Sequence, residues 1–262
     1  MWENELHISW CGNKKGHVIF FLHGWGMNSD IFSDILPFFS DYCIGLIDLY
    51  RSCFHVSLLY NIDTFSDYLV KTLNHLSPAP YLLMGWSLGG VVVMNMACRM
   101  RDKIKGIISV ASPPCFMANE REQGLTLTDI ENFEILLKNN KMKLAKRFLY
   151  LSFFKKNGMI EDKKRLQYWA ERFILMDNTL LFWGLQWLKE TDLSCDVMNI
   201  TCPWLSLYGE SDILVSKRWI DLDVFPSQIH KIIMKESGHM PFLTQRQDFT
   251  EIVTLFLHAE VL

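Results

Sequence analysis

The chain has 262 residues, of which 50% are hydrophobic and 21% charged, and its formal net charge is −3. This length fits one large domain, or a core with one inserted subdomain, and is enough to bury a sizeable apolar interior. No apolar run approaches the ~18 residues that a membrane-spanning helix needs, and residues 1–5 lack the basic start of a signal peptide, so we expect a cytoplasmic protein without membrane contact.

Predicted strands and helices alternate along most of the chain. Residues 6–10 alternate as a half-buried strand does, and residues 17–22 form the continuous apolar run of a fully buried strand. The other predicted strands are residues 42–48, 81–84, 105–111, 203–208 and 228–235. Helices are predicted at residues 64–76, 91–97 and 247–258. This alternation predicts an α/β fold, in which a mostly parallel sheet is flanked by helices.

One long segment breaks the alternation. From about residue 113 to about residue 190 there is no convincing strand, and four stretches look helical: 133–137, 145–154, 166–176 and 180–188. We therefore predict a core made of residues 1–112 and 191–262, with residues 113–190 inserted into it as a helical cap.

The strongest motif is Gly85-Trp86-Ser87-Leu88-Gly89, which lies between a predicted buried strand and a predicted buried helix. The G-x-S-x-G pattern is weak by itself, but in this context it predicts a nucleophile elbow with Ser87 on a sharp turn. Such a turn strains the backbone of its central residue, and the strand and helix pass so close that a Cβ two residues to either side would clash. The two glycines are therefore required.

A second turn follows the strand at residues 17–22, at His23-Gly24-Trp25-Gly26. In an α/β hydrolase, two backbone N–H groups bind the negative oxygen of the tetrahedral intermediate. One belongs to the residue after the nucleophile, here Leu88, and the other to the loop after an early strand, here Trp25. We expect His23 to shape this loop by hydrogen bonding.

A serine hydroxyl needs a base to take its proton and a carboxylate to hold that base in the correct tautomer. His239 and Asp212 each follow a late predicted strand, which puts them at the same edge of the sheet as Ser87, and the order Ser, Asp, His along the chain is that of α/β hydrolases. Glu210 is the alternative acid. Asp212 is favoured because it precedes an apolar segment that would anchor its loop. The histidines within or beside regular elements are interpreted as surface or packing residues: His7, His17, His55, His75, His230 and His258.

Several segments together resemble one enzyme family, the pimeloyl-[acyl-carrier protein] methyl ester esterases of biotin synthesis. The matching segments are Leu22-His23-Gly24-Trp25-Gly26, Gly85-Trp86-Ser87-Leu88-Gly89-Gly90, Val110-Ala111-Ser112-Pro113-Pro114-Cys115-Phe116, Tyr208-Gly209-Glu210-Ser211-Asp212 and Gly238-His239-Met240-Pro241-Phe242. The resemblance implies an α/β-hydrolase fold and a serine carboxylesterase that removes the methyl ester of the carrier-bound acyl chain and releases methanol.

The resemblance also implies roles for individual residues. Carried over by motif, Ser87, Asp212 and His239 would form the catalytic triad. The backbone N–H groups of Trp25 and Leu88 would form the oxyanion hole. The substrate-binding residues would be Trp25, Trp86, Leu88 and Phe148, with Trp86 and Phe148 lining the acyl channel.

One loop departs from the family pattern. Many relatives have a Pro-Gly-x-Gly-x-Ser turn where this chain reads Leu49-Tyr50-Arg51-Ser52-Cys53-Phe54-His55. Because that loop borders the active-site entrance in relatives, the substrate range stays open. Three alternative enzymes would use the same triad: a general short-chain carboxylesterase, a thioesterase or an acyltransferase. The alternative that is not an enzyme is an interaction protein with the same fold and no catalytic activity.

Positive charge is concentrated in the predicted cap. Residues 138–165 contain ten Lys or Arg and two acidic residues, a net charge of +8, whereas the whole chain carries −3. A solvated basic helix face would explain this pattern. A docking surface for an acidic partner explains it too, and acyl carrier proteins are strongly acidic. The predicted docking residues are Lys143, Arg147, Lys163 and Arg165.

Other partners and cofactors are not indicated. Seven cysteines without a C-x-x-C pair indicate reduced thiols rather than a disulfide framework or a zinc site. The sequence has no phosphate-binding or dinucleotide-binding motif, so we expect no metal and no organic cofactor. Nucleic acid is supported by no motif, and we expect a monomer.

Overall fold

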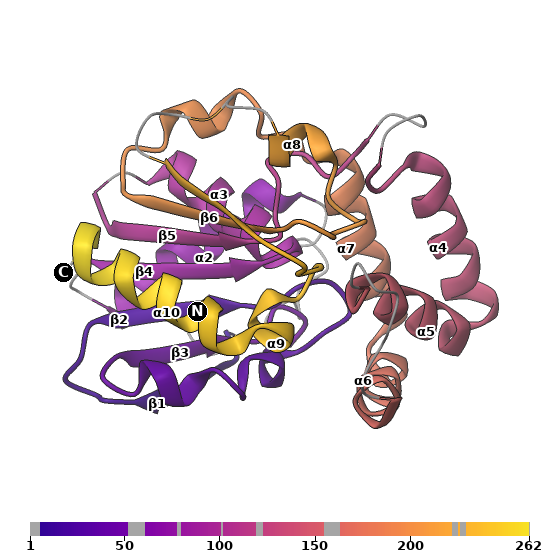
Figure 1. Ribbon diagram of the computed structural model, residues 1–262, viewed down its shortest axis with the longest axis horizontal. Helices are drawn as coiled ribbons and strands as arrows, with labels where there is room; N and C mark the ends of the chain where they lie inside the picture. The colour runs from indigo at the N-terminus through magenta and orange to yellow at the C-terminus, as the bar shows by residue number, and fades with distance from the viewer. Residues whose placement is uncertain are drawn as a thin grey trace.

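A seven-stranded sheet, in the order β1-β3-β2-β4-β5-β6-β7, is the centre of the computed structural model (Figure 1). The structure describes residues 6–51, 61–77, 80–100, 102–118, 123–154, 163–221, 225 and 229–261. The strands are β1 (Ile8–Gly12), β2 (Val18–Leu22), β3 (Cys43–Ile47), β4 (Tyr81–Trp86), β5 (Ile104–Val110), β6 (Trp204–Gly209) and β7 (Ile229–Met234). All neighbouring strands are parallel except β1, which runs antiparallel to β3. The predicted α/β fold is confirmed.

The burial of each strand follows its place in the sheet. Every residue of β4 and β6 is buried, because helices cover both faces of the sheet's interior strands. The edge strands β1 and β7 are only partly buried. In the register, Leu22 lies beside Gly85 and Gly209 beside Met234, so neighbouring strands end at one common edge. The loops that leave this edge carry the predicted site.

Helices lie on both sides of the sheet. In Figure 1, α9 (Pro241–Thr244) and α10 (Arg246–Phe256) lie in front of it, and α2 (Ile62–Leu76) and α3 (Leu88–Arg99) lie behind. The other short helical segments are α8 (Lys217–Asp221), η1 (Ser29–Phe32), η2 (Leu36–Phe39), η3 (Asp196–Asn199) and η4 (Leu257–Val261). Asn28 caps the 3₁₀ turn η1, since its side chain accepts the Asp30 N–H. In the described part of the chain, no helix is long and apolar enough to cross a membrane.

Four helices between β5 and β6 lie side by side beyond the end of the sheet (Figure 1). They are α4 (Leu127–Asn139), α5 (Lys141–Ser152), α6 (Lys163–Leu175) and α7 (Asn178–Glu190), and we refer to them as the cap helices. Side chains fix where three of them begin: Thr126 caps α4, Asn140 caps α5 and Asp177 caps α7. The division into core and cap at residues 113 and 190 stays a prediction.

The glycines around Ser87 are required by close backbone packing. A Cβ on Gly85 would lie 2.3 Å from the Gly89 carbonyl oxygen, and a Cβ on Gly89 would lie 2.2 Å from that of Leu22. Both neighbours are backbone atoms, which cannot rotate away as a side chain can. The helix α3 can therefore approach β4 at Gly85, and the end of β2 at Gly89, only without these side-chain atoms. Both glycines are required, as the sequence predicted, although Gly89 lies against β2 and not against β4.

We expect Gly89→Ala to lower the free energy of unfolding by about 3 kcal/mol, because the added methyl group overpacks a rigid backbone contact. Urea unfolding of the purified variant measures this loss. Gly106→Ala is the matched control, since a Cβ there would lie 3.1 Å from the end of the Val261 side chain, which can move. Equal unfolding midpoints for the two variants would contradict the packing argument.

Candidate active site

Ser87 lies on a strained turn between β4 and α3. Its φ of 54° and ψ of −122° fall in a region that side-chain-bearing residues rarely adopt. The Ser87 N–H donates to the Val110 carbonyl at 2.9 Å, and the Ser87 carbonyl accepts from the Ser112 hydroxyl at 2.8 Å and from the Gly90 N–H at 2.9 Å. These bonds fix the strained backbone, so the side chain stands at the edge of the sheet.

The structure brings Ser87, His239 and Asp212 into one hydrogen-bonded line. The distance from Ser87 Oγ to His239 Nε2 is 2.9 Å, and that from His239 Nδ1 to Asp212 Oδ2 is 2.8 Å. All three residues are at most 3% exposed. Because a carboxylate can only accept, the imidazole proton lies on Nδ1, and Nε2 is left to accept from the serine hydroxyl. This geometry suits a base that takes the Ser87 proton.

Asp212, and not Glu210, is the carboxylate that reaches His239. Asp212 Oδ1 accepts the N–H groups of Leu214 at 2.9 Å and Val215 at 3.3 Å, so the apolar segment anchors the loop as predicted. Glu210 is exposed, and its Oε2 accepts the Glu236 N–H at 3.2 Å. Glu210 therefore stabilises the turn after β7 through this hydrogen bond.

The structure places Trp86 next to the backbone of His239, and its role in the acyl channel stays a prediction. Its indole N–H donates to the His239 carbonyl at 2.8 Å, and its ring packs against Phe242 of α9 at a centroid distance of 5.4 Å. Trp86 is completely buried and is absent from the side chains that surround the space over Ser87. In the structure, Trp86 fixes the backbone of His239 through this hydrogen bond.

The loop at residues 23–27 is fixed by His23, as predicted. The Leu49 N–H donates to His23 Nε2 at 2.9 Å, so the ring proton lies on Nδ1, which donates to the Gly24 carbonyl at 2.9 Å. That carbonyl and the Trp25 N–H belong to the same peptide group and point in opposite directions. His23 thereby sets the direction of one predicted oxyanion donor.

The other predicted donor is the N–H of Leu88. Leu88 is the first residue of α3, so its N–H has no partner within the helix and lies at the positive end of the helix dipole. Leu88 itself is 1% exposed and is not among the side chains that surround the space over Ser87. Its predicted contribution to substrate binding therefore comes from the backbone.

The space over Ser87 is small and apolar. A cavity of about 10 Å³ lies between Ser87, His239 and a set of apolar side chains that includes Trp25, Phe116, Phe133, Phe148, Leu185 and Leu214. A volume of this size holds about one water molecule. Trp25 and Phe148 were predicted to bind the substrate, and both contribute to this wall.

Trp25 connects the site to the cap helices. Its indole N–H donates to the Leu181 carbonyl of α7 at 2.8 Å. Its ring is stacked parallel to Phe133 of α4 and packs edge-on against Phe148 of α5 and Phe173 of α6, with centroid distances of 6.0, 4.9 and 5.2 Å. One residue of the core thus contacts all four cap helices.

Sequence reasoning missed two residues that support the site. Gln123 Nε2 donates to the Asp212 carbonyl at 2.6 Å. The Tyr50 hydroxyl accepts the Gly26 N–H at 2.8 Å. The departure from the family pattern at residues 49–55 was a signal for Tyr50, whereas nothing in the sequence pointed to Gln123. Residues 52–55 of that loop lie outside the described residues.

Asp48 holds the turn that carries Tyr50. Asp48 Oδ1 accepts the N–H groups of Tyr50 at 3.2 Å and Arg51 at 3.1 Å, and it lies 3.5 Å from His23 Nε2. Burial alone raises the pKa of Asp48. The neighbouring His23 ring, together with the backbone N–H and the charge of Arg51, outweighs burial, so the pKa of Asp48 lies below its usual value. Asp48 is therefore ionised near neutral pH.

The four predicted docking residues differ in their surroundings. Lys143 and Lys163 are exposed on α5 and α6. Arg147 forms an ion pair with Asp129 at 3.2 Å, and Arg165 forms one with Asp34 of the core. The two lysines are more available to a partner than the two arginines. Lys155 and Lys156 lie outside the described residues.

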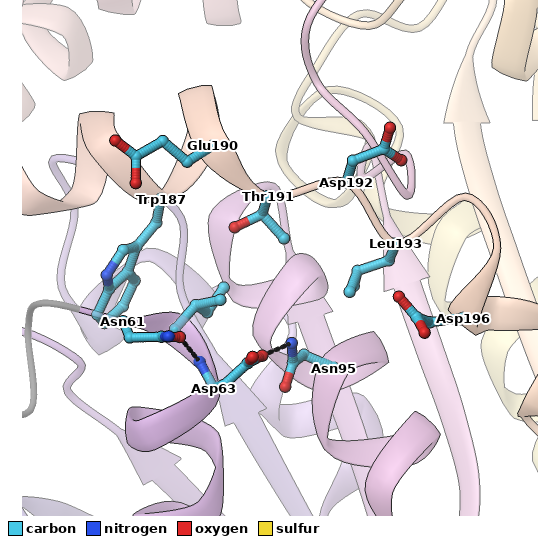
Figure 2. Close-up of a pocket in the computed structure, with 10 residues that line it drawn as sticks. Asn61, Asp63, Asn95, Trp187, Glu190, Thr191, Asp192, Leu193 and Asp196 are labelled. Carbon is cyan, nitrogen blue, oxygen red and sulfur yellow. Dashed lines mark hydrogen bonds between the residues drawn. The ribbon is translucent and has the colours of Figure 1, made fainter.

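A second cleft, of about 290 Å³, lies where α7 returns to the core (Figure 2). It is lined by acidic side chains, but Asp63 accepts a hydrogen bond from Asn95 at 2.7 Å and pairs with Arg99 at 2.7 Å. Neither Ser87 nor His239 lines this cleft. Over the described ranges, no group of His, Cys, Asp or Glu is arranged to hold a metal ion. The cavity over Ser87 is therefore the candidate active site.

Comparison with known proteins gives matches over nearly the whole chain. Residues 17–245 match the model of the alpha/beta hydrolase fold family. The chain is 32% identical to a pimeloyl-[acyl-carrier protein] methyl ester esterase from Shewanella oneidensis, over 97% of this chain and 95% of that protein. It is 30% identical to a protein of the same name from Aeromonas hydrophila, over 93% and 96%. A bromoperoxidase structure from Bacillus anthracis has a TM-score of 0.85 at 19% identity, covering 97% and 95%, and is alike in fold.

We expect a fluorophosphonate probe to label the protein covalently at Ser87, because His239 is placed to take the proton of this hydroxyl. Intact-mass and peptide mass spectrometry measure the labelling. Ser87→Ala should take up no probe, and Ser66→Ala is the matched control, since Ser66 Oγ is buried without a hydrogen-bond partner among the described residues. Labelling at another serine would contradict the assignment.

Proposed function

Because the chain belongs to the pimeloyl-[acyl-carrier protein] methyl ester esterases, within the alpha/beta hydrolase fold family, we propose that it hydrolyses pimeloyl-[acyl-carrier protein] methyl ester to pimeloyl-[acyl-carrier protein] and methanol in biotin synthesis. The observation that carries the proposal is the line from Ser87 through His239 to Asp212 at the floor of an apolar cavity. We also propose that the protein is a cytoplasmic monomer, as its sequence predicts.

The first half of the reaction forms an acyl-enzyme. Ser87 Oγ attacks the ester carbonyl carbon while His239 Nε2 takes the hydroxyl proton, and Asp212 stabilises the resulting imidazolium through Nδ1–H. The N–H groups of Trp25 and Leu88 hold the negative oxygen of the tetrahedral intermediate. When the intermediate collapses, the bond to the methoxy oxygen breaks, His239 gives its proton to that oxygen, and methanol leaves.

The second half releases the acid. A water molecule takes the place of methanol, His239 removes its proton, and the hydroxide attacks the acyl carbon. The second tetrahedral intermediate expels Ser87 Oγ, which recovers its proton from His239. The enzyme returns to its starting state, and the acyl chain ends in a carboxylate.

The acyl chain requires the wall of the cavity to move. A cavity of about 10 Å³ has no room for a seven-carbon chain. Phe133, Phe148 and Leu185 belong to cap helices, and Trp25 joins these helices to the core through its bond to Leu181. The proposal therefore includes displacement of the cap helices, or rotation of these side chains, when the substrate enters.

The carrier protein is proposed to dock on the exposed lysines of α5 and α6. Lys143, Lys146, Lys163 and Lys164 are exposed there. We leave the predicted Arg147 and Arg165 out of the docking surface, because they form ion pairs with Asp129 and with Asp34 of the core. Positive charge beside the cap helices would attract an acidic carrier and speed its association.

We expect the purified protein to release methanol from pimeloyl-[acyl-carrier protein] methyl ester, with a higher kcat/KM than for a free short-chain methyl ester. Ser87→Ala should lose about 10⁶-fold in kcat, since the nucleophile is gone. Gas chromatography of methanol and mass spectrometry of the carrier measure both reactions. Hydrolysis of the free ester alone would contradict the biotin assignment, and release of pimelate from the carrier would indicate a thioesterase.

We expect Lys143→Glu combined with Lys163→Glu to lower kcat/KM for the carrier-bound ester by about 10-fold at low ionic strength, because charge reversal repels an acidic carrier. The loss should shrink at high salt, and hydrolysis of the free ester should not change. Lys14→Glu combined with Lys71→Glu is the control, since this pair makes the same charge change at exposed positions outside the cap helices. An equal loss for both esters would contradict docking at this surface.

A further inference from the structure

Tyr50 reaches from the atypical loop after β3 to the loop that carries Trp25. Its hydroxyl accepts the Gly26 N–H at 2.8 Å, and its ring lies 5.4 Å from that of His23. The turn that begins at Asp48 sets its position, because Asp48 Oδ1 accepts the Tyr50 N–H. The backbone of Tyr50 is therefore held by Asp48, and its hydroxyl is held by the Gly26 N–H.

The backbone that Tyr50 contacts has a left-handed conformation and is closely packed. Gly26 has a φ of +67°, and a Cβ there would lie 2.2 Å from the Phe173 ring. The Met27 N–H donates to the Gly24 carbonyl at 3.3 Å, which closes a tight turn with Trp25 and Gly26 at its centre. Small rotations of the two peptide groups in such a turn change the direction of the Trp25 N–H.

Two side chains hold these two peptide groups. His23 Nδ1 donates to the carbonyl of the peptide that joins Gly24 to Trp25, and the Tyr50 hydroxyl accepts the N–H of the peptide that joins Trp25 to Gly26. The φ and ψ angles of Trp25 lie between these two groups. With one group fixed on each side, the direction of the Trp25 N–H is defined.

We propose that Tyr50 is a positioning residue for the oxyanion hole: its hydroxyl holds the Trp25–Gly26 peptide so that the Trp25 N–H points to the oxygen of the tetrahedral intermediate. The inference rests on the proposed function, in which Trp25 supplies that N–H. Tyr50 does not contact the reacting atoms. Its effect belongs to the transition state, because the ester carbonyl gains its negative charge only there.

Removal of the hydroxyl should weaken this alignment without removing the donor. Loss of one oxyanion donor costs about 10²–10³-fold in turnover. Tyr50 also lines an open cleft of about 590 Å³, from which a water molecule can replace part of the lost hydrogen bond. We therefore expect Tyr50→Phe to lower kcat by about 10-fold, less than the full loss of a donor.

The test compares Tyr50→Phe with Tyr42→Phe on a free short-chain p-nitrophenyl ester. Both variants lose one hydroxyl and keep the ring, but the Tyr42 hydroxyl is buried without a hydrogen-bond partner among the described residues. Tyr50→Phe should lower kcat by about 10-fold with KM within about twofold, and should weaken a trifluoromethyl ketone inhibitor, which forms the tetrahedral oxyanion, by a similar factor. Tyr42→Phe should change neither.

The outcomes separate this inference from the proposed function. Unchanged kcat in Tyr50→Phe, or a rise in KM with kcat and inhibitor affinity unchanged, would overturn the positioning role while Ser87-dependent hydrolysis stands. A fall in kcat could also come with a lower unfolding temperature and an unchanged ratio of inhibitor affinity to substrate affinity. That result would show that Tyr50 acts by packing, and it would also overturn the positioning role. Absence of Ser87-dependent hydrolysis in the unmodified protein would overturn the proposed function and this inference together.

Discussion

The buried hydrogen bonds that join Ser87, His239 and Asp212 link loops that follow three different strands of one sheet. Their lengths of 2.9 and 2.8 Å leave little tolerance in the position of any strand end. The close approach of α3 to β4 at Gly85 and to the end of β2 at Gly89 is one condition for this geometry. The bonds from Trp86 to His239 and from Ser112 to Ser87 are others.

The geometry of the site also depends on the cap helices, because Trp25 contacts them. Its backbone belongs to the turn that His23 and Tyr50 hold, while its side chain contacts α4, α5, α6 and α7. A movement of the cap helices that opens the cavity must break or bend some of these contacts. In the proposed mechanism, Trp25 therefore connects substrate entry with the geometry of the oxyanion hole.

The chemistry of this chain could be predicted from sequence because it depends on local patterns. The elbow, the residues after each strand and the order Ser87, Asp212, His239 all follow from neighbours in the chain. The hydrogen bonds of Trp86 and Tyr50 could not be predicted in this way. Both depend on which backbone group lies opposite a side chain in the folded protein. Arg165 is similar, since its pairing with Asp34 joins residues far apart in sequence.

The most direct test of the account compares Asp212→Asn with Glu210→Gln in kcat for a free short-chain ester. Both variants replace a carboxylate with an amide of the same shape in one loop. Asp212→Asn should lower kcat by about 10⁴-fold, because the amide no longer holds His239 in the tautomer that accepts the Ser87 proton. Glu210→Gln should stay close to the unmodified protein. Equal activities, or a larger loss for Glu210→Gln, would contradict the hydrogen-bonded line on which the site depends.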